Sequence, residues 1–314
     1  MRKIVGKVVI KIKSIFPTNE NEIKLVQFIG RFQYISNKDI KYFFSDTYYP
    51  KRIARLVNNN ILRRYQKYLV LGDDGYNFMK ILNQHTVPLV YQKKYADRLK
   101  FMSHLSALYN KDNQITFEPS FEIKDKTVFT ESSRRYIGIL NIFGTKYLTY
   151  HISKEHTQKY ISSVIYDLQK ETNYKNVIIL IDNINRIDLR DFAFGLNSVI
   201  ICNDNDTELQ KLKYLHQLNW NKVIDKLYGN QIYLSEYTFC DYTDSRDKYI
   251  TTFYFIDAEK INRIDTFLKN NAQKQADIIC DDSIVKLLGK EIPTANYKVI
   301  NLDKFIEKNI RIYD

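Results

Sequence analysis

Apolar side chains recur at helical spacing through residues 20–44, and this pattern predicts two helices. The first helix is expected from about residue 20 to 33, with Asn19 as its N-cap. Its buried face would hold Ile23, Val26, Phe28, Ile29 and Phe32. The second helix is expected from 37 to about 44, behind Ser36 as its N-cap. Its core-facing residues would be Ile40, Phe43 and Phe44.

A third helix and a β-hairpin follow in the next segment. Pro50 fits the first turn of a helix over 50–60, because a missing N–H there has no helical partner to lose, and Asp46 or Thr47 would cap that helix. Two β-suited runs then flank a two-residue turn and predict a tight hairpin over 61–71. The order of three helices and a hairpin predicts a winged helix-turn-helix.

The pattern changes after Pro88, first to a helical period that predicts a connecting or dimerising helix, and from residue 114 to strands alternating with helices. The continuous apolar runs 176–182 and 198–202 are typical of central strands covered on both faces. Further strands are expected at 114–123, 134–143, 146–152, 231–240, 249–257, 276–280 and 297–302. Helices are expected near 154–172, 206–228, 258–271, 283–289 and 302–309.

These patterns together predict an α+β or α/β fold class with three parts. Residues 1–86 would form a winged-helix DNA-binding domain, and residues 87–112 a connecting helix. Residues 113–314 would form an α/β domain, built on a mixed sheet with flanking helices. That large domain would serve dimerisation or partner binding, or be a degenerate nuclease-like domain.

Charge is distributed unevenly along the chain. The 314 residues include 48 Lys and Arg against 36 Asp and Glu, which gives a formal net charge of +12. Residues 1–110 hold 20 of the basic and 7 of the acidic residues, and the remaining 204 residues hold 28 and 29. The whole excess therefore belongs to the first third, which indicates that this end of the chain meets a polyanion.

Basic residues of the first third coincide with the elements that would contact DNA. A helix of about eleven residues fits the major groove, and a hairpin can lie along the phosphate backbone. Tyrosine hydroxyls in front of the third helix can donate to phosphates. The candidate DNA-binding residues are Lys38, Tyr48, Tyr49, Lys51, Arg52, Arg55, Arg63, Arg64 and Lys67. The alternative is a small interaction domain whose charges form a solvated face.

The cysteines and the hydropathy pattern bear on the compartment. No run of about 18 apolar residues is present, so no membrane-spanning helix is expected. The chain starts with apolar residues interrupted by lysines, which is unlike a signal peptide. Cys202, Cys240 and Cys280 are odd in number and far apart, as expected of reduced thiols. We therefore expect a cytoplasmic protein without a zinc site.

Acidic residues near position 120 were the best match to a catalytic motif. Glu122-Ile123-Lys124 fits the Glu-x-Lys element of Mg²⁺-dependent nucleases, with Glu118 close before it. Both acids fall on one predicted strand, whereas such a site takes them from two strands, so solvent-facing charges are favoured. The sequence contains no His-x-His pair, Gly-rich phosphate loop or EF-hand spacing. It therefore indicates no metal and no cofactor, and favours a binding protein over an enzyme.

Three segments, GRFQYISNKDIKYFF, PKRIARLVNNNILRRY and YLVLGDDGYNFMKIL, resemble winged-helix DNA-binding proteins. More narrowly, they resemble the replication-relaxation family of plasmids and other mobile elements of Gram-positive bacteria. The matching residues are Tyr34, Ile35, Ser36, Ile40, Phe43, Phe44, Arg52, Ile53, Leu56, Asn60, Ile61, Leu62, Arg63, Tyr68, Leu69, Gly75 and Tyr76. The resemblance implies DNA binding linked to plasmid replication, mobilisation or their regulation. It also implies a large domain that partly shares the restriction-endonuclease-like fold, here without activity.

The expected function is sequence-specific binding of double-stranded DNA by the N-terminal winged helix, in the replication initiation or control of a plasmid or mobile element. Two alternatives stay open: a Mg²⁺-dependent nuclease or relaxase-like nicking enzyme that uses the C-terminal domain, and a ligand-responsive transcriptional regulator. The expected partners are duplex DNA, a second copy in a homodimer, and replication or mobilisation proteins. No membrane partner is expected.

Overall fold

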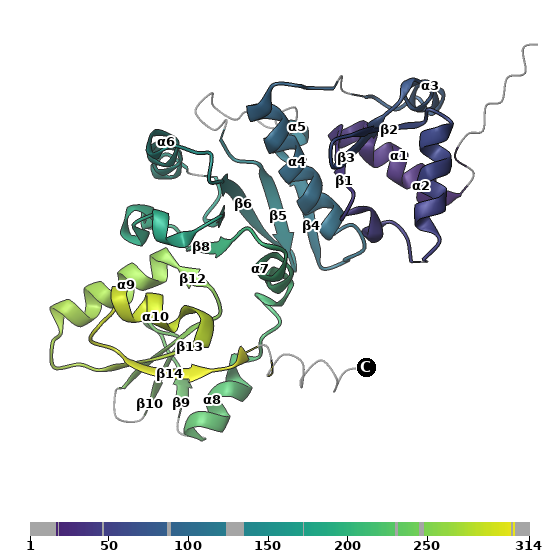
Figure 1. Ribbon diagram of the computed structural model, residues 1–314. Coiled ribbons are helices and arrows are strands. Elements are labelled where there is room, and N and C mark those ends of the chain that lie inside the picture. The colour runs from purple at the N-terminus through teal and green to yellow at the C-terminus, as the bar shows by residue number, and fades with distance from the viewer. Residues whose placement is uncertain are drawn as a thin grey trace, which may run out of the picture. The chain divides into compact units, whose positions relative to one another are not determined.

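The computed structural model describes residues 17, 19–45, 47–86, 89–123, 135–171, 173–229, 232–244, 248–302 and 304. The chain divides into two compact units, Met1–Asp112 (unit 1) and Asn113–Asp314 (unit 2). Each unit combines helices with β-sheet (Figure 1). The chain therefore belongs to the α+β class at the level of its secondary structure, as expected.

Unit 1 places a small antiparallel sheet among helices. Its strands occur in the order β1-β3-β2, with β1 paired to β3 at Ile35–Leu69 and Ser36–Tyr68. In chain order the elements are α1 (Glu20–Phe32), β1 (Ile35–Ser36), the 3₁₀ helix η1 (Ile40–Tyr42), α2 (Tyr49–Asn58), β2 (Leu62–Tyr65), β3 (Tyr68–Leu71), α3 (Asp73–Ile81) and α4 (Lys93–Leu108).

Local sequence explains the first helix and the approach of α3 to the hairpin. The Asn19 side chain accepts a hydrogen bond from the Asn21 amide at 2.9 Å, so Asn19 caps α1 as predicted. A Cβ atom on Gly72 or Gly75 would lie 2.1 Å from the backbone carbonyl oxygen of Asn60 or Ile61, respectively. Only glycine therefore allows the start of α3 to pack directly against the chain that enters the hairpin.

The helix predicted over 37–44 is wrong, because only the 3₁₀ turn η1 forms there. Ser36 pairs with Tyr68 of β3, and its hydroxyl accepts from the Lys38 amide at 3.3 Å, but the turn after it extends only to η1. Asp39 is buried and bonds His104 of α4 at 3.0 Å. Its carboxylate ties this segment to the neighbouring helix.

The third predicted helix forms as α2, but its start differs from the prediction. The N-cap position is Tyr48, whose side chain makes no capping hydrogen bond, and Thr47 precedes it. Asp46, the other predicted cap, lies outside the described residues. Pro50 stands in the first turn as predicted. The helix after Pro88 forms as α4, which contacts α1, β1 and η1 within unit 1.

The first sheet of unit 2 has six strands in the order β12-β8-β7-β6-β5-β4. Strands β6, β7 and β8 are parallel, and the outer pairs are antiparallel. Its strands are β4 (Ile115–Pro119), β5 (Gly138–Ile142), β6 (Thr145–Ile152), β7 (Asn176–Ile181), β8 (Ser198–Asn203) and β12 (Ile256–Asp257). Its connections include α5 (Ser120–Ile123), α6 (Gln158–Gln169), η3 (Ile184–Arg186) and η4 (Leu189–Phe192).

The second sheet of unit 2 has five strands in the order β14-β13-β11-β10-β9. Strands β11, β13 and β14 are parallel, and β9 and β10 extend the sheet in antiparallel pairing. Its strands are β9 (Ile232–Leu234), β10 (Tyr242–Asp244), β11 (Tyr249–Phe253), β13 (Ala276–Asp281) and β14 (Asn296–Ile300). The remaining helices are α7 (Asp206–Lys211), η5 (Leu212–Tyr214), α8 (Trp220–Tyr228), α9 (Ala258–Asn270) and α10 (Asp282–Glu291).

Unit 2 corrects the expectation of one mixed sheet, because two mixed sheets form. The run 249–257 has the pattern of one strand but supplies β11 to one sheet and β12 to the other, with a bend at Tyr254-Phe255. The helix predicted over 206–228 is divided into α7, η5 and α8. Residues 120–123 form α5 rather than the end of a strand. Most of the helix predicted at 302–309 lies outside the described residues.

Asp257 joins β12, β8 and α9 through a single carboxylate. Its oxygens accept hydrogen bonds from the amides of Glu259 and Lys260, so Asp257 is the N-cap of α9. They also accept from the Ser198 hydroxyl at 2.6 Å and from the Val199 amide at 3.1 Å. Four donors therefore depend on this side chain.

Asp257→Ala is expected to lower the free energy of unfolding by about 2–3 kcal/mol, because it removes a helix cap and leaves donors of β8 without their acceptor. Urea denaturation followed by circular dichroism measures this change. The matched control is Asn205→Ala, which removes an exposed cap that serves only the Glu208 amide of α7 among the hydrogen bonds described, with an expected cost of about 1 kcal/mol. Equal losses in both variants would contradict the joining role of Asp257.

Candidate nucleic-acid interface

Helix α2 presents a narrow exposed face on which every side chain except that of Lys51 is short. Ile53 and Leu56 are buried and fix the rotation of the helix. The residues opposite to them are exposed, namely Pro50, Lys51, Ala54 and Asn58. Short side chains on this face allow the helix backbone to come close to whatever it binds. The pattern of buried positions could have identified Ala54 and Asn58 from the sequence, but the search for cations missed them.

The three cations predicted on α2 have different surroundings. Lys51 is exposed, whereas Arg52 and Arg55 are half-buried. The Arg52 guanidinium lies 6.0 Å from the centre of the Phe44 ring. The Arg55 guanidinium donates to the carboxylate of Glu22 on α1, and that carboxylate is almost fully buried. Arg55 therefore neutralises a buried charge and positions α2 against α1.

The two tyrosines in front of α2 also differ. Tyr48 is 66% exposed, and the Lys51 ammonium lies 5.8 Å from its ring centre. Tyr49 is half-buried and stacks on Phe44 with a ring distance of 5.9 Å. Tyr48 is thus placed to contact a ligand at the start of α2, whereas Tyr49 packs on the core of unit 1.

The hairpin carries its cations on both faces and at its tip. Arg63 and Arg64 are exposed on β2 and pair with Val70 and Leu69 of β3, so their side chains lie on opposite faces. Lys67 is exposed in the turn. The Asn37 amide donates to the Lys67 carbonyl oxygen at 3.1 Å, which brings the exposed Lys38 to the same end of the sheet. The structure therefore groups Lys38 with the hairpin tip.

Acidic residues are scarce in the segment that carries these cations. Residues 33–71 contain eight Lys and Arg but two acids, Asp39 and Asp46. Asp39 is buried against His104, and Asp46 is not among the described residues. Among the described residues of this segment, no acidic side chain is therefore exposed. The surface of α2 and the hairpin has an electrostatic excess suited to a polyanion.

Tyrosines beside the hairpin were missed by the sequence analysis. Tyr34 is fully buried, and its ring lies 6.2 Å from Tyr65 and 5.9 Å from Tyr68. Tyr65 in turn lies 6.1 Å from the exposed Tyr91. The alternation along β2 puts Tyr65 on the same face as Arg63, and this period-two pattern is the signal that the sequence offered.

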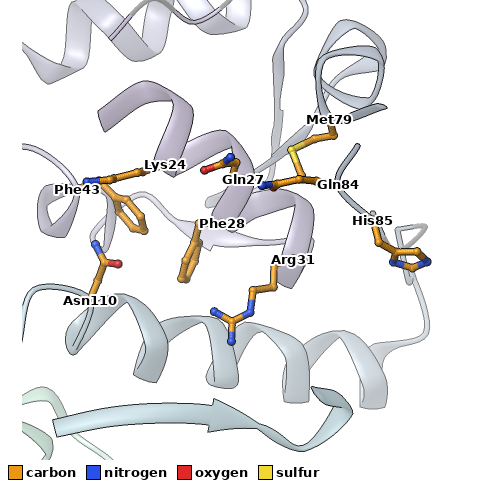
Figure 2. Close-up of a pocket in the computed structure, with 9 residues that line it drawn as sticks. All are labelled: Lys24, Gln27, Phe28, Arg31, Phe43, Met79, Gln84, His85 and Asn110. Atoms are coloured by element: carbon orange, nitrogen blue, oxygen red, sulfur yellow. The ribbon is translucent and has the colours of Figure 1, made fainter. Parts of the chain in front are cut away.

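A pocket of about 510 Å³ lies beside α1 in unit 1 (Figure 2). Its apolar lining comes from three buried side chains, Phe28, Phe43 and Met79. Phe28 and Arg31 extend from α1 in the same direction. The polar lining residues are Lys24, Gln27, Arg31, Gln84, His85 and Asn110. None of the nine is acidic, so the pocket suits a small anion that carries a flat apolar group.

Polar residues of unit 2 gather where parallel strands end. His151 at the end of β6 bonds Asp204 after β8, at 2.9 Å. Arg186 bonds Asp182 after β7 and donates to the backbone oxygen of Ser153. These contacts fasten the loops at this edge of the sheet to one another. The described residues contain no group of three His, Cys, Asp or Glu side chains that could hold a metal ion.

The predicted nuclease motif is not assembled on one strand. Glu118 lies in β4, at the edge of the six-stranded sheet, and Glu122 lies in the short helix α5. Lys124 is outside the described residues. The two carboxylates therefore belong to different kinds of element, and nothing in the described structure arranges them as a metal site.

Comparison with known proteins gives no relative for this chain: no protein-family model, curated protein or solved structure matches it. Among the described residues, no helix combines the length and the apolar character needed to cross a membrane. The assignment of function therefore depends on the geometry of the chain itself.

Arg55→Met is expected to lower the free energy of unfolding by about 2–3 kcal/mol, because the buried Glu22 carboxylate loses its cation. Thermal or urea unfolding of the full chain measures the loss. Lys51→Met on the exposed face of the same helix is the control and should change stability by less than about 0.5 kcal/mol. The double variant Glu22→Gln/Arg55→Met should recover part of the loss. If Arg55→Met behaves like Lys51→Met, Arg55 has no positioning role.

Proposed function

We propose that unit 1 binds double-stranded DNA as a winged helix-turn-helix, with α2 in the major groove and the β2–β3 hairpin as the wing. The order α1, β1, η1, α2, β2, β3 and the three-stranded antiparallel sheet support this assignment. The fold alone does not determine the function, so the proposal depends on the charge and shape of the surface of unit 1.

The observation that carries the proposal is the one-sided charge of α2 and the hairpin. Exposed cations occur on the helix, on both faces of β2 and at the tip, without an exposed acid among the described residues of 33–71. Duplex DNA carries one negative charge per roughly 1.7 Å of helix axis, so such a surface gains affinity by displacing counterions. Solvated charges on an ordinary surface alternate in sign more evenly.

Individual residues have distinct roles in this proposal. Lys51 and the small residues Pro50 and Ala54 let α2 approach base edges. Arg64 and Lys67 contact phosphates beside the groove, and Tyr48 donates its hydroxyl to a phosphate at the start of α2. Lys38 adds charge at the hairpin tip.

We place this activity in the replication initiation or control of a plasmid or mobile element, where a protein of this kind recognises a specific duplex site. Unit 2 would then serve a second copy of the chain or a replication or mobilisation partner. Footprinting on the DNA that flanks the gene of this protein tests the setting, since such proteins often bind near their own locus.

Arg64→Ala and Lys67→Ala should each weaken binding to all duplexes alike, and each should reduce the slope of log K against log salt concentration by about 0.9. Fluorescence anisotropy of the full chain with duplex DNA at several salt concentrations measures both effects. The matched control is Lys159→Ala, which removes an exposed cation from α6 of unit 2.

An equal loss in the Lys159 variant would mean that only net charge matters. A slope that is unchanged in the Arg64 and Lys67 variants would contradict the wing assignment. Supercoiled plasmid incubated with the full chain and Mg²⁺ addresses the alternative enzyme, because cleavage that Glu122→Ala abolishes would replace this proposal by a nuclease.

The pocket beside α1 favours a second candidate function, a DNA-binding protein that responds to a small anion. Phe28 and Phe43 would contact a flat ring, and Arg31 would face the anionic group. Arg31 extends from α1 in the same direction as Phe28, so Arg31 is the residue to test.

Adenosine monophosphate, as a probe, should raise the Tm of the full chain by about 2–4 °C at concentrations well above its Kd, because a ligand that binds the folded state stabilises it. Arg31→Met should remove the shift. Differential scanning fluorimetry measures it. An unchanged Tm in the wild-type chain, or a shift that survives Arg31→Met, contradicts the pocket as an anion site.

A further inference from the structure

Tyrosine rings beside the hairpin form a series of tilted and edge-on contacts from the core of unit 1 to solvent. Tyr34 is fully buried, Tyr65 is half-buried and Tyr91 is 63% exposed. The ring centres of successive members lie 6.2 Å and 6.1 Å apart. The exposed Tyr91 ring is therefore accessible to another flat group.

Hydrogen bonds fix the segment that carries Tyr91 to the core of unit 1. The Tyr34 hydroxyl donates to the Val90 carbonyl oxygen. The Val90 amide donates to the side-chain oxygen of Gln33 at 2.8 Å. Residues 33 and 34 therefore hold both polar backbone groups of the residue before Tyr91. The Tyr91 ring is positioned in advance, which lowers the entropy lost when it binds a partner.

Cations surround the tyrosines. Arg63 shares its face of β2 with Tyr65. Lys67 lies 5.8 Å from the ring centre of Tyr68, and Tyr68 contacts Tyr34. Burial raises the pKa of Tyr76, Tyr91 and Asp73 raise it further and Arg63 lowers it, so these side chains lie near one another. Tyrosine rings and the cations Arg63 and Lys67 therefore lie close together at this edge of the hairpin.

We propose that Tyr65 and Tyr91, named here the tyrosine platform, stack unpaired DNA bases at a junction between duplex and single strand. This inference rests on the proposed duplex binding by α2 and the hairpin. Bases inside a duplex have both faces covered by their neighbours, so an exposed tyrosine ring finds a free base face only where the duplex opens or ends. Arg63 and Lys67 supply charge for the phosphates of the same strand.

Stacking on aromatic side chains tolerates any base, because every base has a π-face. The platform therefore adds affinity for an opened strand without adding sequence preference. The exposed face of α2 and the tyrosine platform then recognise different features of one DNA, namely the sequence of the duplex and the presence of an unpaired strand next to it.

The test uses the full chain and three labelled DNAs: a blunt duplex, the same duplex with a short single-stranded extension, and the extension strand alone. Fluorescence anisotropy should show tighter binding to the extended duplex than to the blunt duplex. Tyr91→Ala should weaken binding to the extended duplex by about tenfold and leave blunt-duplex binding unchanged. Tyr91→Phe should bind like the wild-type chain, because it keeps the ring and removes the hydroxyl.

Tyr166→Ala is the matched control, since Tyr166 is a 49% exposed tyrosine on α6 of unit 2. It should leave all three affinities unchanged. Circular dichroism confirms the fold of each variant, and Tyr65→Ala repeats the test from the second ring of the platform.

Three results would overturn the platform. The first is equal affinity of the wild-type chain for blunt and extended duplexes. The second is a preference that survives Tyr91→Ala and Tyr65→Ala. The third is a Tyr91→Phe variant as weak as Tyr91→Ala, which would show that the hydroxyl bonds a phosphate instead. Failure of the proposed function is distinguishable, because then the blunt duplex itself is not bound.

Discussion

Carboxylates that are buried away from water fix the positions of neighbouring elements in both units. A buried charge is costly unless a cation or several N–H donors meet it, so each such residue specifies its partners. Glu22 holds Arg55 and with it α2, and Asp39 holds His104 of α4. In unit 2 the buried Glu259 accepts the amides of Phe194 and Leu196, which places η4 and the loop after it against α9. Elements that are far apart in the chain are oriented by these contacts.

Burying a carboxylate costs free energy of desolvation, and the cation that pairs with it offsets this cost only in part. Burial raises the pKa of Asp167, although Arg135 donates to this carboxylate at 2.7 Å and acts in the opposite direction. Asp277 is 1% exposed and meets Lys248 at 2.8 Å and the Tyr228 hydroxyl at 2.6 Å. Contacts of this kind contribute orientation more than stability, because apolar packing of the same volume would stabilise as much.

Sequence periodicity predicted elements whose neighbours are close in the chain. The helix behind Asn19, the helix around Pro50 and the hairpin all formed, since their signals are local caps, turns and apolar spacing. The prediction over 37–44 failed because the contacts of this segment, with β3 at Ser36 and with His104 at Asp39, come from distant parts of the chain. The pattern over 249–257 predicts a single strand and does not indicate that the segment contributes to two sheets. Arg55 was predicted to face DNA, and its actual partner Glu22 lies 33 residues earlier, beyond any local pattern.

The contacts of Val90 with Gln33 and Tyr34 also define the smallest piece of this chain that can fold as unit 1. They join positions 57 and 56 residues apart, and α4 follows directly after them. A fragment that ends at residue 86 would lack Ala96 and Leu99, which cover Tyr34 and Val70. It would expose an apolar surface beside a strand edge, where chains associate with one another. Shortening the protein to its predicted winged helix would therefore produce a fragment that is prone to aggregation. A fragment for expression should instead end after residue 112.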